Sequence, residues 1–314
     1  MFGKVLGNID TYLTKEDDIL KNDINRFINY LNVEKGYSPR TVDEYRLDIE
    51  SSLVPFLGKL GVSNVKHVTK DGIQRYLDYL AKERGNCSAT RARKLASAKA
   101  YFNYLVETGV LKENPARSIR NPKIENKQPD YLTDLEINSL LGTVKHRAKP
   151  EMLQRDLAMI IILLHTGLRV SELTGLKMMD IDIGTKHLKV LRKGRKEQYV
   201  PLNSEAVKIL GEYLSQREQC QTDRCFVNLK GNSLSRVSIY NIIRRYFNLA
   251  GIKKDKKGPH VLRHTFCTRL HRKGVDPFII KELAGHKSLN TTMRYVSIED
   301  KQHAHAVEKL VGLL

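Results

Sequence analysis

Apolar side chains recur at helical spacing through the first third of the chain, and polar or proline residues mark the helix starts. The first segment places Ile24, Phe27, Ile28 and Leu31 on one face. Ser38 followed by Pro39 is typical of an N-cap with proline in the first helical turn. The pattern predicts four helices, over residues 23–33 and 39–57, from Thr69 through Leu80, and from Ser88 to near Gly109.

This periodicity lapses over residues 117–131, where prolines and charged side chains replace the apolar positions. Thr133 and Glu136 then have the spacing of a capping box, which indicates that a new helix begins there. We therefore expect an all-helical domain over residues 1–116, a linker over 117–131 and a second domain over 132–314.

The second domain is expected to mix helices with a small sheet. Residues 157–165 form an apolar run that predicts a buried helix. Residues 188–191 and 198–202 have the composition of strands, and the intervening Lys193-Gly194-Arg195-Lys196 predicts a tight turn. Helices are predicted again from Ser204 onward, so the fold class is mainly α with a small β-sheet.

The chain is strongly basic. Among 314 residues, 54 Lys and Arg outnumber 35 Asp and Glu, which gives a formal charge of +19. Such an excess favours a polyanionic partner, either a nucleic acid or an anionic membrane surface. The membrane is the weaker interpretation, because the longest apolar run, residues 157–164, is far shorter than the roughly 20 residues that span a bilayer.

Cysteine usage and the N-terminus favour the cytoplasm. Four scattered cysteines are too few for a disulfide framework in a chain of this length. Cys220 and Cys225 lack a second Cys or His pair at zinc-finger spacing, so we expect no metal site. The first residues carry no sustained apolar stretch, so no signal peptide is evident.

Five short segments of the second domain contain candidate chemistry, although each has an ordinary structural explanation when taken alone. Arg169, which follows a glycine turn, can be a surface residue, and Lys193 can belong to a solvated turn. His286 after Gly285 can cap a helix, and a tyrosine at helical spacing, such as Tyr295, is usually a packing residue.

The segment from Gly258 to His264 is more informative. Pro259 predicts a helix start, and His260 and Arg263 then lie three residues apart on one face of its first turns. The backbone N–H groups and the dipole at a helix N-terminus favour an anion at this place.

Together, these segments resemble the tyrosine recombinases, in particular the compact Xer and mobile-element integrase branch. The motifs are Thr-Gly-Leu-Arg-Val-Ser-Glu-Leu at 166–173, His-x-Leu-Arg-His at 260–264, Leu-Ala-Gly-His at 283–286, and the tyrosine at 295. The resemblance extends over nearly the whole chain from about Ile24. It implies a helical SAM-like core DNA-binding domain followed by a mixed α/β catalytic domain.

The resemblance also implies a role for each matching residue. Arg169 and Arg263 match the arginines that bind the scissile phosphate, and Tyr295 matches the nucleophile. His260 and His286 match the two histidines, Glu172 matches a supporting acidic residue, and Lys193 matches the lysine of the turn. Arg192, Arg195 and Lys196 are the alternatives to Lys193, and only its pairing with Gly194 favours Lys193 over them.

These residue types suit phosphodiester cleavage. Two permanently charged guanidinium groups can neutralise the charge that develops on the phosphate. A tyrosine hydroxyl, with an ordinary pKa near ~10, needs a base or a cationic field, and His260 is the expected proton acceptor. Lys193 is expected to protonate the leaving 5′-hydroxyl. The implied product is a 3′-phosphotyrosine, formed without metal, ATP or another cofactor.

The implied partner is double-stranded DNA with a specific recombination site. The resemblance assigns the last long helix of the first domain to the major groove. The candidate DNA contacts are Arg84, Arg91, Arg93, Lys94 and Lys99, with Arg40 and Arg46 as further backbone contacts. The resemblance also implies a homotetramer built through residues 298–314. Whether an accessory activator protein takes part remains open.

Two other functions compete with recombination. A type IB topoisomerase shares the nucleophile and the surrounding cations, but the compact first domain argues against it. A non-catalytic architectural DNA-binding protein would not need the full set of Arg169, Lys193, His260, Arg263, His286 and Tyr295. Within the family, chromosome-dimer resolution and mobile-element integration both remain open.

Overall fold

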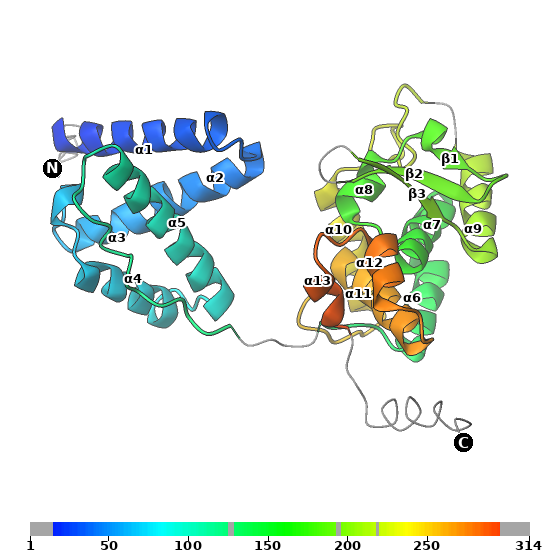
Figure 1. The fold of residues 1–314 in the computed structure, drawn as a ribbon. Coiled ribbons are helices and arrows are strands. Elements are labelled where there is room, and N and C mark those ends of the chain that lie inside the picture. Colours follow the sequence, from blue (N-terminus) through cyan, green and yellow to red (C-terminus); the bar gives the residue numbers. More distant parts are fainter. Residues whose placement is uncertain (1–14, 125–128, 193–195, 218–219, 296–314) are drawn as a thin grey trace, which may run out of the picture. The chain divides into compact units, whose positions relative to one another are not determined.

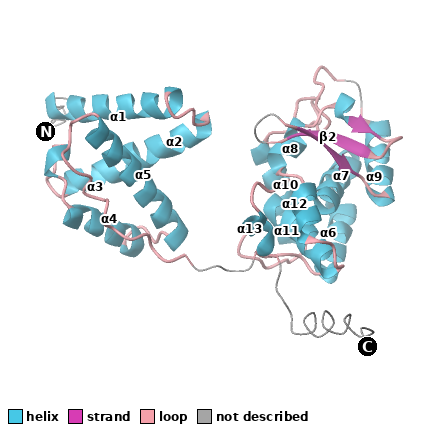
Figure 2. Cartoon of the chain, in the orientation of Figure 1, coloured by secondary structure: helices cyan, strands magenta, loops and turns pink. Residues whose placement is uncertain are grey.

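The computed structural model describes residues 15–124, 129–192, 196–217 and 220–295. The chain divides between residues 126 and 127 into two compact units, here called unit 1 and unit 2 (Figure 1). The prediction of a mainly helical chain with one small sheet is confirmed (Figure 2). Among the described helices, none is long and apolar enough to cross a membrane.

Unit 1 consists of helices, and two of the helix starts predicted from capping residues are confirmed. The hydroxyl of Ser38 accepts the N–H of Thr41 at 3.3 Å, and that of Thr69 accepts the N–H of Gly72 at 3.2 Å. The elements are α1 (Lys15–Val33), α2 (Pro39–Asp48), a π-helical turn (Ile49–Leu53), α3 (Val54–Lys59), a 3₁₀ turn (Val65–His67), α4 (Lys70–Lys82) and α5 (Ser88–Glu107).

The second predicted helix, over residues 39–57, is present but is not α-helical throughout. It is interrupted by the π-helical turn, where the N–H of Val54 bonds to the carbonyl of Ile49. Pro55 follows directly and has no N–H to continue the α-helical ladder. The wider turn restarts the helix around this proline while Ile49 and Leu53 stay buried in the core.

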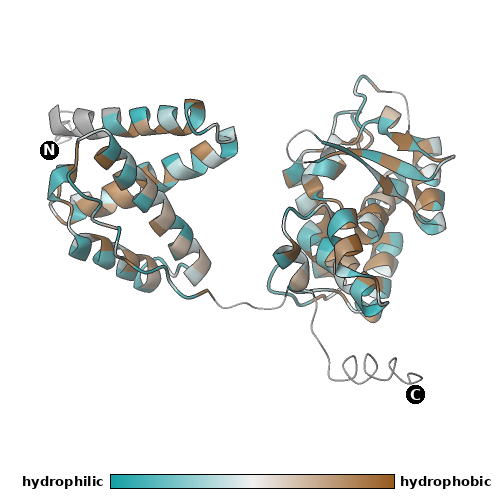
Figure 3. Ribbon diagram, in the orientation of Figure 1, coloured by the Kyte–Doolittle hydropathy of each residue, from teal (hydrophilic) through white to brown (hydrophobic). Residues whose placement is uncertain are grey.

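The core of unit 1 forms around α5. Five apolar residues of this helix are each at most 1% exposed: Leu95, Ala98, Tyr101, Phe102 and Leu105. Most helices of the unit carry both hydrophobic and hydrophilic residues (Figure 3), as expected for helices packed on one face.

One carboxylate is buried between α2 and α5. Asp48 is 2% exposed and accepts hydrogen bonds from Arg93 at 2.5 Å, Lys94 at 3.1 Å and Ser97 at 2.8 Å, all on α5. Because a buried carboxylate needs such partners, this cluster ties the end of α2 to the middle of α5.

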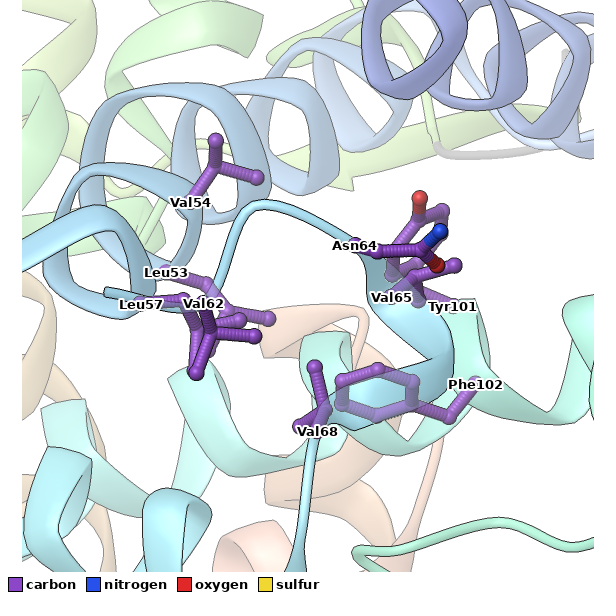
Figure 4. A pocket seen from close by; sticks show the side chains of 9 residues that line it. All are labelled: Leu53, Val54, Leu57, Val62, Asn64, Val65, Val68, Tyr101 and Phe102. Atoms are coloured by element: carbon purple, nitrogen blue, oxygen red, sulfur yellow. The ribbon is translucent and has the colours of Figure 1, made fainter. Parts of the chain in front are cut away.

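A small pocket also lies in unit 1, next to the π-helical turn (Figure 4). Its volume of about 20 Å³ is close to that of one water molecule, and its lining is almost entirely apolar. The lining residues are Leu53, Val54, Leu57, Val62, Asn64, Val65, Val68, Tyr101 and Phe102. We interpret it as a packing defect and assign it no function.

Unit 2 begins with the predicted capping box. The Thr133 hydroxyl accepts the Glu136 N–H at 3.2 Å, and the Glu136 carboxylate accepts the Thr133 N–H at 2.8 Å. The helices are α6 (Asp134–Arg147), α7 (Pro150–Thr166), α8 (Val170–Gly175), α9 (Ser204–Gln216), α10 (Arg236–Leu249), α11 (Pro259–Arg272), α12 (Pro277–Ala284) and α13 (Leu289–Met293).

Helix α7 is the centre of unit 2. Residues 157–164 are all at most 6% exposed, so this helix is buried on every side, and α6, α9 and α11 pack against it. The predicted hairpin is present as β2 (His187–Leu191) and β3 (Glu197–Pro201), with Leu188 opposite Val200. A short antiparallel strand, β1 (Ile181–Asp182), joins β2 and was not predicted.

The buried carboxylate of unit 1 gives a stability prediction. We expect Asp48→Ala to lower the free energy of unfolding by about 3 kcal/mol, because it leaves the half-buried Lys94 ammonium and the buried Ser97 hydroxyl without their acceptor. Urea unfolding of the full chain measures the change, with hydrogen exchange of the α5 amides to assign it to unit 1.

The control is Asp43→Ala, which removes an exposed carboxylate from the same helix and should change stability by less than about 0.5 kcal/mol. Equal effects of the two substitutions would show that the Asp48 cluster contributes nothing.

Candidate active site

The site begins at the glycine turn that ends α7. Gly167 has φ +62°, and a Cβ on it would lie 2.3 Å from the Phe266 ring, so both the conformation and the close approach require glycine. Arg169 follows as the N-cap residue of α8. The turn therefore places this arginine between the end of α7 and the residues of α11.

Glu172 on α8 organises the basic side chains around it. Its carboxylate accepts from the Arg169 N–H at 2.7 Å and the Arg169 guanidinium at 2.8 Å. It also accepts from the Arg192 guanidinium at 2.7 Å. The Glu172 and Arg192 side chains are 4% and 8% exposed, so this ion pair is shielded from water, whereas the Arg169 side chain is 33% exposed.

The same two arginines cap the C-terminus of α12. Arg192 donates to the carbonyls of Leu283 at 2.9 Å and Ala284 at 3.2 Å, and Arg169 donates to the carbonyl of Gly285 at 2.7 Å. Three successive carbonyls that end a helix thus find cationic donors, which is favourable with respect to the helix dipole. This junction fixes the corner at which His286 follows.

Arg263 reaches the same turn from α11. It is 5% exposed and donates to the carbonyl of Gly167 at 2.5 Å. Burial, together with the nearby positive charge of Arg169, lowers the pKa of Arg263 to about 10. Two guanidinium groups of like charge are therefore held close together by the fold.

His286 and Tyr295 lie against each other beside these arginines. Their rings are nearly parallel, with centroids 6.0 Å apart, and Nδ1 of His286 bonds to the Thr292 hydroxyl at 2.8 Å. Burial and the charges of Arg263 and Arg169 lower the pKa of His286 to about 4, so the ring is neutral.

The Tyr295 hydroxyl lies 2.5 Å from Nδ1 of His264 on α11. The residue is 7% exposed and packs with Phe266, Cys267, Ile280 and Ala284. Burial raises the pKa of its hydroxyl well above the ordinary value, although Arg263 and Arg294 oppose this shift. The phenol therefore keeps its proton in this arrangement.

His260 occupies the first turn of α11 and is exposed. Loss of solvation and the charges of Arg263, Lys256 and Arg169 lower the pKa of its ring. We call Arg169, Arg263, His260 and His286 the cationic pocket. Because nearby arginine charge contributes to the lowered pKa values of Arg263, His260 and His286, an anion bound among them would offset this repulsion.

The structure thus brings together most of the site predicted from the sequence. Arg169, Glu172, Arg263, His286 and Tyr295 meet in unit 2, with His260 beside them. Lys193 lies outside the described residues. The flanking residues of its turn are described, and the Arg192 N–H bonds to the Lys196 carbonyl at 2.8 Å.

Two residues of the site were missed by sequence reasoning. Arg192 had been weighed only as an alternative to Lys193, and His264 only as a letter of the motif at 260–264. Apart from Gln198, six positions away, the side-chain partners of Arg192 lie 20 and about 90 positions away, and Tyr295 is 31 positions after His264. No local spacing could have signalled either contact.

The candidate DNA contacts of unit 1 have intramolecular partners in several cases. Arg93 and Lys94 bond to Asp48, and Lys99 donates to the carbonyl of Ile119 at 2.6 Å. Arg40 pairs with Glu44, Arg46 with Glu50, and Arg91 donates to the Ser88 hydroxyl. Arg84 is exposed just before α5.

Comparison with known proteins gives a consistent result. Residues 130–302 match the phage integrase family, and residues 24–109 match the phage integrase N-terminal SAM-like domain. A tyrosine recombinase of Pseudothermotoga lettingae is 34% identical over 293 residues, 92% of this chain and 98% of the relative. Tyrosine recombinase XerC of Myxococcus xanthus is 34% identical over 290 residues, covering 89% and 94% of the two chains.

Among solved structures, the XerH site-specific recombinase bound to palindromic difH substrate, in a post-cleavage complex, has a similar fold. Its TM-score with this chain is 0.74 at 22% identity, with 95% of this chain and 97% of that chain covered.

The α12 junction gives a second prediction. A Cβ on Gly285 (φ +64°) would lie 2.8 Å from the Arg192 guanidinium, which four hydrogen bonds hold in place. We expect Gly285→Ala to cost about 1 kcal/mol of left-handed strain and about 2 kcal/mol more for displacing Arg192.

Gly274→Ala is the matched control. It has φ +78° with nothing within 4 Å of the added Cβ, so it carries only the backbone strain. Urea unfolding of both variants measures the difference, and an equal loss of stability in the two would contradict a tightly held Arg192.

Proposed function

Because the chain belongs to the phage integrase family of tyrosine recombinases, we propose that it is a site-specific DNA recombinase that cleaves and rejoins strands through a 3′-phosphotyrosine at Tyr295. The resemblance seen in its motifs is confirmed by the family matches over both units. The observation that carries the proposal is that Arg169 and Arg263 lie near each other and near His286, whose ring lies against Tyr295.

The cationic pocket suits a scissile phosphate. The bonds from Arg169 to Glu172 and Gly285 occupy two of the five N–H donors of a guanidinium group, so others can bind the non-bridging oxygens. Arg263 and His286 are held by Gly167 and Thr292, respectively. Donors fixed in this way need no reorganisation as negative charge develops on the phosphate.

An open cleft beside the cationic pocket has a lining suited to the phosphates of a DNA backbone. Its lining includes Arg169, Arg192, Lys196, His286 and Lys287. Arg192 and Lys196 are the described residues that flank the turn of Lys193. This supports the assignment of Lys193 as the group that protonates the leaving 5′-hydroxyl.

In the proposed reaction, the Tyr295 oxygen attacks the phosphorus and the 5′-oxygen leaves with a proton. The 5′-hydroxyl of a partner strand then attacks the phosphotyrosine and regenerates the tyrosine. Because the phosphoester is exchanged for another phosphoester, the reaction needs neither ATP nor a metal.

We further propose that the protein acts as a homotetramer on two copies of a specific DNA site, in the cytoplasm at the nucleoid. The proposed assembly uses residues 298–314, which lie outside the described residues. Unit 1 would contact the duplex through α5 and the turn before it.

Sequencing the DNA held in covalent complexes distinguishes chromosome-dimer resolution, with one chromosomal site, from mobile-element integration, with sites at element ends.

A recombinase joins the cleaved strand to a partner strand, and this exchange distinguishes the proposed function from that of a type IB topoisomerase. The matches of both units to the integrase family favour the recombinase. An accessory activator protein is compatible with this function, and purified components with and without cell extract would reveal whether one is required.

Tyr295→Phe should abolish covalent trapping on a nicked suicide duplex that carries the recovered site, while DNA binding stays within about twofold of wild type. The substitution removes only the attacking oxygen. Denaturing gels measure the adduct and mobility shifts measure binding. Tyr199→Phe, at a tyrosine 66% exposed on β3, is the control. An adduct formed by Tyr295→Phe would disprove the nucleophile assignment.

Arg169→Ala should bind the same duplex but cleave it at least about 10²-fold more slowly, because it removes a donor that stabilises the developing charge. Single-turnover cleavage measures the rate. Arg236→Ala, which removes a cation at the start of α10, serves as the control. Wild-type cleavage by Arg169→Ala would exclude this residue from phosphate binding.

A further inference from the structure

The nucleophile has an unexpected partner. His264 lies on α11 directly after Arg263, and its Nδ1 is 2.5 Å from the Tyr295 hydroxyl. The two ring centroids are 5.4 Å apart. His260 lies one turn earlier on the same helix, in an exposed position. The hydroxyl thus bonds to the second histidine of the motif and not to the first.

The direction of this hydrogen bond follows from the protonation states. Burial and the neighbouring His260 and Arg263 lower the pKa of His264 to about 4, so its ring is neutral. Tyr295 keeps its proton for the reasons given above. The phenol therefore donates to an unprotonated Nδ1, and the ring proton of His264 is on Nε2.

We propose that His264 is the catalytic base of the reaction, which orients the Tyr295 hydroxyl and accepts its proton during the attack on the phosphate. This inference rests on the proposed function. As the bond from the Tyr295 oxygen to phosphorus forms, the phenolic proton passes to Nδ1 and the bond from phosphorus to the 5′-oxygen breaks. The 5′-oxygen takes its proton from Lys193.

The reverse half of the cycle is balanced in the same way. When the partner 5′-hydroxyl attacks the phosphotyrosine, the tyrosine oxygen leaves and recovers the proton from the His264 imidazolium. One residue thus serves as base in cleavage and as acid in rejoining. His260, exposed at the N-terminus of α11, is then left to hydrogen-bond the phosphate.

The surrounding charges make this transfer dependent on DNA. His264 faces the cations Arg263 and Lys256, the ring of His260 and the carboxylate of Asp130. Tyr295 faces Cys267, Arg263 and Arg294. Without an anion, an imidazolium at His264 is repelled by these cations. A phosphate bound in the cationic pocket offsets them, so the proton can move only when the substrate is present.

The test uses single-turnover cleavage of a nicked suicide duplex that carries the site recovered by sequencing. His264→Asn keeps an acceptor oxygen near the position of Nδ1 but cannot take up a proton. We expect a rate at least about 10²-fold below wild type, with DNA binding and melting temperature unchanged. His187→Asn, at a histidine on β2 that bonds to the Thr185 carbonyl, is the matched control.

The pH profile gives a readout that a structural role would not change. The wild-type rate should rise with pH and reach a plateau once His264 is deprotonated on DNA. With His264→Asn the plateau should be lost, because the remaining acceptor is solvent. Added imidazole should restore cleavage to His264→Ala but not to Tyr295→Phe. This rescue experiment tests the proposal if the His264→Asn variant is unstable.

A duplex with sulfur in place of the bridging 5′-oxygen isolates the nucleophile side, because a thiolate leaves without a proton. The His264→Asn defect should persist on this duplex. If His264→Asn cleaves this duplex at the wild-type rate, His264 acts on the leaving group and the proposal is overturned. The proposal is also overturned if His264→Asn cleaves the ordinary duplex at the wild-type rate with an unchanged pH profile. If the wild-type protein forms no adduct on either duplex, the proposed function itself fails.

Discussion

The site depends on one buried carboxylate. Glu172 holds Arg169 and Arg192, and these two arginines in turn hold the last carbonyls of α12. A single short helix thereby joins the end of α7, the base of the β2–β3 hairpin and the corner that carries His286. Removing one partner from a buried ion pair costs about 3–5 kcal/mol. Loss of one of these side chains should therefore loosen the contacts among α8, the end of α7, the β2–β3 hairpin and the corner that carries His286.

The fold also accepts an electrostatic cost in the absence of DNA. Arg263 is held near Arg169, and burial together with nearby positive charge lowers the pKa values of His260, His264 and His286. Backbone carbonyls and Glu172 hold the arginines in place despite this repulsion. An anion bound beside these arginines would offset this repulsion, and under the proposed function this would link phosphate binding to the protonation of Tyr295.

Local patterns predicted the parts of the structure that depend on local interactions. The capping box at Thr133, the Ser38 cap and the β2–β3 hairpin were all evident from residues a few positions apart. The π-helical turn before Pro55 was not, because a proline after an apolar run permits several helix endings. The family resemblance supplied Arg169, Arg263 and Tyr295. Arg192 and His264 were missed because tertiary packing alone selects their partners.

Asp48 has a further consequence for unit 1. Each phosphate that a protein cation neutralises releases condensed counterions, and this release sets the salt dependence of binding. Arg93 and Lys94 already share an internal carboxylate, so in the proposed complex they would bring its negative charge with them to the duplex. A count of its 54 Lys and Arg residues therefore overstates the number of ions that this protein would displace from DNA. Its affinity should change less steeply with ionic strength than a count of its basic residues implies.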